Sequence, residues 1–94
     1  MSKDLHSEAM DRLFEAILTL ENKEECYQFF EDVCTINEVQ AMAQRFEVAG
    51  LLRTKETYQA ISKKTGASTA TISRVNRFIN YGNGGYQLVW DRTK

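Results

Sequence analysis

The chain has 94 residues, of which 43% are hydrophobic and 27% are charged, and its formal net charge is −1. This length suits one domain with a single core, and the sequence contains neither an apolar run long enough to span a membrane nor a secretory signal pattern. Cys26 and Cys34 form no CxxC motif and have no histidine nearby, which argues against a disulfide framework or a zinc site and favours buried thiols in a reducing cytoplasm.

The N-terminal residues predict two helices. Ser2 is a candidate N-cap for the first, in which apolar residues recur at helical spacing from Leu5 to Leu20. Residues 22–25, Asn-Lys-Glu-Glu, resemble a capping box and predict the start of a second, shorter helix. The apolar residues of this second helix are Cys26, Phe29, Phe30 and Val33.

A third helix is predicted from a second capping box at residues 35–38, Thr-Ile-Asn-Glu, to about Leu52. This helix is apolar on nearly every side, which is typical of a helix at the centre of an assembly. Five or six short helices cannot easily bury the apolar residues of the first two helices within one subunit. Interlocking of two subunits would bury them, so a homodimer is predicted, with a compact monomer as the alternative. These residues are Leu13, Phe14, Ile17, Leu18, Phe29 and Phe30.

Residues 58–77 predict a helix-turn-helix. The first helix extends from Tyr58 to Thr65 and ends at Gly66, which supplies a left-handed backbone conformation. The second begins at Ser68 or Thr69 and continues past residue 77. Apolar positions that would hold the pair together are Ile61, Ala67, Ile72 and Val75.

The polar face of the second helix predicts DNA binding. Short hydroxyls, a methyl group and arginines are the side chains that contact phosphates, thymine and guanine in the major groove. Phosphate contacts are expected from Lys63, Lys64, Thr69 and the first backbone amides of the helix. Base-edge contacts are expected from Thr69, Ala70, Ser73, Arg74 and Arg77. The complete predicted set is Lys63, Lys64, Ser68, Thr69, Ala70, Ser73, Arg74 and Arg77.

The distribution of charge supports the same interpretation. Residues 1–52 carry eleven acidic and four basic side chains, a balance of −7, whereas residues 53–78 carry six basic side chains and one acidic one, a balance of +5. Positive charge is thus concentrated on the helix-turn-helix, where phosphate binding requires it. Chance segregation of charge in a short chain is the alternative.

The sequence predicts a single all-α domain in three parts. Residues 1–53 are the expected dimerisation helices, and residues 54–81 contain the helix-turn-helix. Residues 82–94 consist of a Gly-Asn-Gly-Gly loop followed by a short helix over Tyr86–Trp90.

The segment from Glu38 to Asn76 resembles the Trp repressor superfamily, and within it the TrpR-like, YerC/YecD-type branch of small bacterial proteins. Residues 65–74, Thr-Gly-Ala-Ser-Thr-Ala-Thr-Ile-Ser-Arg, are similar to the repressor's Leu-Gly-Ala-Gly-Ile-Ala-Thr-Ile-Thr-Arg. The resemblance extends without a gap over residues 36–80. It implies an intertwined, all-helical homodimer that binds palindromic double-stranded DNA and regulates transcription, with repression as the expected outcome.

The resemblance is incomplete at the effector site. In the family two arginines sandwich the indole of tryptophan, and a glycine beside one of them leaves space. Arg74 matches that arginine, but Val75 replaces the glycine, and the second arginine aligns with Gln44, next to Arg45. One residue corresponds to about 100° around a helix, so Arg45 can face elsewhere. Arg45 and Arg74 are the candidate effector residues, but the sequence favours no cofactor, with tryptophan or another small effector as the alternative.

Two other classes of function are an enzyme and a protein-interaction module. The sequence contains no Ser/His/Asp or Cys/His arrangement, no paired carboxylates in an apolar setting and no glycine-rich phosphate loop, so an enzyme is not predicted. A protein-interaction module built on a helix-turn-helix scaffold is the more serious alternative, and it predicts that Arg74 and Arg77 are dispensable for DNA binding.

Overall fold

The computed structural model describes residues 5–93, and those residues form six helices and no strand. The chain divides into two compact units, Met1–Thr35 and Ile36–Lys94. The first unit contains α1 (Glu8–Ile17) and α2 (Lys23–Val33). The second contains α3 (Ile36–Arg53), α4 (Tyr58–Thr65), α5 (Thr69–Tyr81) and α6 (Gly85–Arg92). None of the described helices is both long and apolar enough to cross a membrane.

Helix α1 begins later than predicted. Its N-cap is Ser7, whose side chain accepts a hydrogen bond from the backbone N–H of Met10 at 3.1 Å, and the residues immediately before it are not helical. Ser2, the predicted cap, lies outside the described residues. Either serine can cap a helix, and apolar periodicity that extends across both does not distinguish them.

The predicted start of α2 at Asn22 is confirmed, but the return bond of the capping box goes to Glu21, one residue before the N-cap. The side chain of Asn22 accepts a hydrogen bond from the backbone N–H of Glu25 at 2.9 Å, while the carboxylate of Glu25 accepts one from the backbone N–H of Glu21 at 2.9 Å. Neither α1 nor α2 contains a buried residue. The prediction of buried thiols is therefore wrong for the single chain, because Cys26 is exposed and Cys34 is half-buried, both as free thiols.

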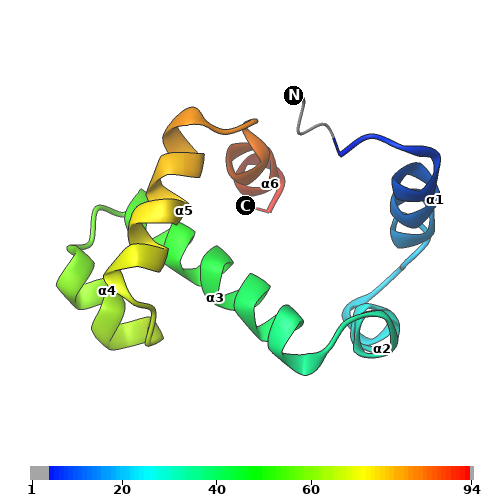
Figure 1. The fold of residues 1–94 in the computed structure, drawn as a ribbon, viewed down its shortest axis with the longest axis horizontal. Coiled ribbons are helices and arrows are strands. Elements are labelled where there is room, and N and C mark those ends of the chain that lie inside the picture. Colours follow the sequence, from blue (N-terminus) through cyan, green and yellow to red (C-terminus); the bar gives the residue numbers. More distant parts are fainter. Residues whose placement is uncertain (1–4, 94) are drawn as a thin grey trace. The chain divides into compact units, whose positions relative to one another are not determined.

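The hydrophobic core lies in the second unit, where α3, α4 and α5 pack against one another. Figure 1 shows α5 crossing α3 near the end at which α3 leads into α4. Only Val48 and Ala49 of α3 are buried, whereas Ile36 near its start is 72% exposed. The core residues are Val48, Ala49, Ile61, Ala67, Ile72, Val75 and Trp90.

Helix α6 is attached to α3 by aromatic contacts. The rings of Phe46 and Tyr86 stack with centroids 6.4 Å apart, and those of Tyr86 and Trp90 stack at 5.8 Å. The guanidinium of Arg53 lies 4.8 Å from the centroid of the Trp90 ring, within the range of a cation–π interaction. These contacts hold α6 against α3, and Trp90 is part of the buried core.

Candidate nucleic-acid interface

The predicted helix-turn-helix is present with the predicted boundaries. Helix α4 ends at Gly66, which adopts a left-handed conformation with φ of 77°, and its N–H donates to the carbonyl of Ser62 at 2.8 Å. Ser68 then caps α5 by accepting a hydrogen bond from the backbone N–H of Thr71 at 3.1 Å. The turn is short because a glycine ends one helix and a serine begins the next, as the sequence predicts.

Helix α5 has one buried and one exposed face. Ile72 and Val75 are 0% and 1% exposed, and Ile79 packs against the same core. The eight residues predicted to contact DNA are all exposed: Lys63, Lys64, Ser68, Thr69, Ala70, Ser73, Arg74 and Arg77. Since residues four apart lie on one face of a helix, Thr69, Ser73 and Arg77 form a row, with Ala70 and Arg74 beside it.

Most of the polar groups in this row are available for a ligand. The side chains of Thr69, Ser73, Arg74 and Arg77 form no hydrogen bond or ion pair with any other described residue. An exposed arginine without a protein partner retains all its N–H donors for phosphate or for the O6 and N7 atoms of guanine. The chemistry of this face therefore suits a polyanion that carries hydrogen-bond acceptors.

Two of the predicted residues already have protein partners. The amine of Lys64 donates to the carboxylate of Glu56 at 3.0 Å, and the two side chains are 54% and 30% exposed. The hydroxyl of Ser68 caps α5 and donates to the hydroxyl of Thr71 at 3.2 Å. Any phosphate must therefore compete with the carboxylate of Glu56 for Lys64, and the hydroxyl of Ser68 already caps the start of α5.

The two arginines predicted to bind an effector are exposed, whereas the residues beside them are used for contacts within the protein. Arg45 and Arg74 are exposed, and neither side chain interacts with another described residue. Gln44 is half-buried instead, and its Nε2 donates to the carbonyl of Thr65 at 3.1 Å. Val75 is part of the core. Sequence reasoning missed the contacts of Gln44 and Glu56, because each partner is distant along the chain and no local motif identifies it.

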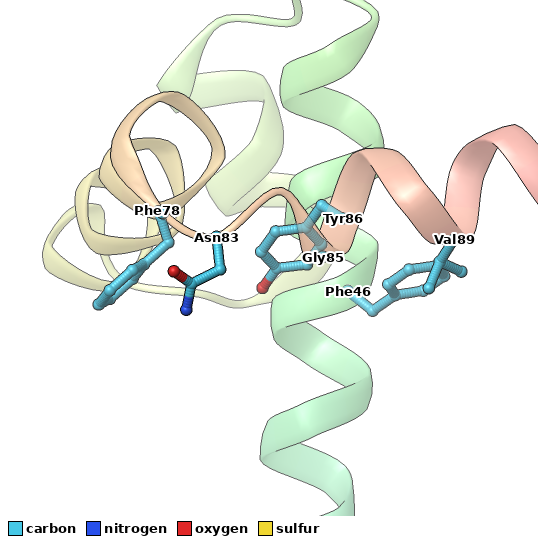
Figure 2. A pocket seen from close by; sticks show the side chains of 7 residues that line it. Phe46, Phe78, Asn83, Gly85, Tyr86 and Val89 are labelled. Atoms are coloured by element: carbon cyan, nitrogen blue, oxygen red, sulfur yellow. The ribbon is translucent and has the colours of Figure 1, made fainter. Parts of the chain in front are cut away.

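An apolar pocket lies beside the C-terminal end of α5. Its volume is about 340 Å³, and Figure 2 shows Tyr86 between Phe78 and Asn83 on one side and Phe46 and Val89 on the other. No cluster of three or more histidine, cysteine or acidic side chains that could hold a metal ion occurs within residues 5–93. The pocket lies at the junction of α3, α5 and α6, and aromatic and apolar groups form most of its lining.

Comparison with known proteins gives concordant results from sequence and structure. Residues 8–94 match the Trp repressor protein family. The uncharacterized protein YerC of Bacillus subtilis (strain 168) is 57% identical over 90 residues, covering 96% of this chain and 86% of that protein. The crystal structure of a TrpR like protein from Eubacterium eligens ATCC 27750 is 58% identical, with a TM-score of 0.93 and coverage of 97% of this chain and 94% of that chain. A solved structure from Staphylococcus aureus is 55% identical, with a TM-score of 0.90 and coverage of 94% and 88%.

Proposed function

Because the chain belongs to the Trp repressor protein family, we propose that it is a sequence-specific, DNA-binding transcriptional regulator. It acts as a homodimer that inserts helix α5 of each subunit into the major groove of a palindromic site, and repression is the expected outcome. A location in the cytoplasm is part of the same proposal, supported by the two free cysteines.

The exposed face of α5 carries this proposal. Thr69, Ser73 and Arg77 form a row with no described protein partner, on a helix whose opposite face is fixed in the core. A helix held rigidly on one side and left unpaired on the other is suited to recognition, because its side chains need not break existing bonds to bind. No comparable row of free donors occurs on the acidic first unit among the described residues.

The contacts divide into two kinds. Lys63, Thr69 and the first backbone N–H groups of α5 bind phosphates, which positions the helix without selecting a sequence. Ala70, Ser73, Arg74 and Arg77 contact base edges, Ala70 through a thymine methyl group and the arginines through guanine. Lys64 adds a phosphate contact once its ion pair with Glu56 opens. Ser68, the N-cap of α5, contributes its backbone N–H to the same phosphate contacts.

A homodimer accounts for the apolar surface of the single chain. Phe14 and Leu18 in the first unit are 49% and 83% exposed, and Ile36 in the second is 72% exposed. Exposure of this many large apolar side chains is typical of a surface that a partner covers. Two copies also supply two α5 helices, which is the arrangement that binds half-sites one helical turn apart.

Binding without tryptophan is part of the proposal. The family's corepressor needs a glycine beside the arginine that corresponds to Arg74, and here Val75 occupies that position inside the core. The second arginine is replaced by Gln44, which is already hydrogen-bonded to Thr65. Both positions that would have to accommodate an indole are therefore used for packing within the protein.

Selection of sites from a random duplex pool at physiological salt, with and without L-tryptophan, tests the proposal. We expect enrichment of a palindrome with half-sites about one helical turn apart in both conditions. Enrichment only with L-tryptophan would overturn the effector-free mechanism. Absence of enrichment in both conditions would contradict sequence-specific binding and favour the protein-interaction module.

A further inference from the structure

The turn between α4 and α5 is connected to α3 by one directional contact. Gln44 lies four residues before the fully buried Val48, so both side chains lie on the face of α3 that contacts the helix-turn-helix. From there the Nε2 of Gln44 reaches the carbonyl of Thr65, the last residue of α4, at 3.1 Å. A carbonyl in the last turn of a helix has no partner within that helix, and Gln44 provides one.

The side chain of Thr65 connects the end of α4 to the turn by hydrogen bonds. Its hydroxyl donates to the carbonyl of Ile61 at 2.8 Å and accepts a hydrogen bond from the backbone N–H of Ala67 at 3.1 Å. Ala67 is 2% exposed, and the next residue, Ser68, is the N-cap of α5. The amide of Gln44 is therefore linked, through Thr65 and Ala67, to the residue that precedes Ser68, the N-cap of α5.

We propose that Gln44 is a positioning residue for DNA binding: its hydrogen bond to Thr65 fixes the orientation of α5 relative to α3. The apolar core holds the helices together, but apolar contacts are non-directional and tolerate small rotations. A hydrogen bond requires a defined distance and angle, so it selects one orientation among several that bury the same side chains. This inference rests on the proposed function and assigns it a residue that does not touch DNA.

The variant Gln44→Met tests the proposal, because methionine has a similar length and carries no N–H donor. Gln40→Met is the matched control, since Gln40 lies on the same helix one turn earlier and is exposed. The readout is the ratio of affinities for the selected palindrome and for random DNA, measured by mobility shift at one salt concentration. A role confined to stability would lower the fraction of active protein and leave this ratio unchanged.

For Gln44→Met we expect the ratio to fall about five- to tenfold, which corresponds to the loss of one hydrogen bond, with little change in affinity for random DNA. Amide hydrogen exchange at Ala67 and Ser68 should accelerate in the same variant without DNA, and Gln40→Met should match the wild type in both measurements. An unchanged ratio in Gln44→Met beside a selective wild type would overturn the role of Gln44 alone. A wild type that selects no sequence would overturn the proposed function, and with it this assignment.

Discussion

The amine of Lys64 lies 3.0 Å from the carboxylate of Glu56, so a lysine predicted to bind phosphate is paired with an acidic side chain in the loop just before α4. Both side chains are partly exposed, and a pair of this kind contributes at most about 1 kcal/mol to stability. The carboxylate of Glu56 has a larger effect on the electrostatic potential of the helix-turn-helix, because Glu56 is the one acidic residue within the basic segment 53–78. Glu56 therefore lowers the affinity of this segment for any polyanion.

Removing this carboxylate should strengthen DNA binding. In Glu56→Gln, Lys64 is free to contact phosphate, and we expect affinity for selected and random DNA to rise by a similar factor of about two to ten. The dependence of log affinity on log salt should steepen by up to about one phosphate contact. Titrations at several salt concentrations measure both. Glu47→Gln, the same charge change at an exposed position of α3, is the control, and an equal effect there would show that net charge alone is responsible.

Arg77 and Lys63 should affect binding differently, although both are exposed cations. Arg77→Ala should cost about 1–3 kcal/mol on the selected site and much less on random DNA if the guanidinium contacts a guanine through two hydrogen bonds. Lys63→Ala should weaken binding to all sequences alike and reduce the salt slope by about one. Equal losses on selected and random DNA for Arg77→Ala would refute its base-reading role.

A charge on the apolar surface at the C-terminal end of α1 should separate the proposed dimer. Leu18 is 83% exposed in the single chain, and burying a carboxylate at this position under a partner would be strongly unfavourable. We expect Leu18→Asp to sediment as a monomer and to lose cooperative binding to the palindrome. Gln28→Asp introduces the same charge at an exposed polar position of α2 and should remain dimeric. Dimers of normal stability in both variants would exclude Leu18 from the interface.

Two glycines should respond in opposite directions to alanine. A Cβ at Gly82 would collide with the carbonyl oxygen of Phe78, whereas a Cβ at Gly50, within α3, would meet no atom within 4 Å. Gly82→Ala should therefore destabilise the protein by about 1–3 kcal/mol. Gly50→Ala should stabilise it by up to about 1 kcal/mol, because alanine is the better helix former. Thermal unfolding followed by circular dichroism measures both, and a lower Tm for Gly50→Ala would indicate that a partner approaches this position closely.

The helix-turn-helix could be predicted from the sequence because its determinants are local. Gly66 ends α4 because glycine adopts the left-handed conformation of a C-cap without strain. Ser68 caps α5 because its side chain accepts a hydrogen bond from the helix that follows it. Ile72 and Val75 then identify the buried face of α5, which leaves the predicted DNA-binding residues exposed. Short-range steric and hydrogen-bonding requirements are sufficient to specify this part of the fold.

The contacts between elements could not be predicted in the same way. Lys64 reaches Glu56 in the loop before α4, so this pair depends on how the loop folds back on the helix. Gln44 reaches Thr65 from another helix, so this contact depends on how the helices pack. The prediction that Cys26 is buried is wrong for the single chain. An apolar face predicts that one side of a helix is covered, but it does not identify the chain that covers it. Sequence periodicity specifies faces, and tertiary packing specifies their partners.

The aromatic contacts of α6 give the protein an internal optical reporter. Trp90 is the single tryptophan of the chain, it is 7% exposed, and its ring contacts both Tyr86 and the guanidinium of Arg53. Its fluorescence therefore comes from one known position, where α6 meets the end of α3. Detachment of α6 would bring water to the indole and shift its emission to longer wavelength, so the state of the second unit can be followed without any label.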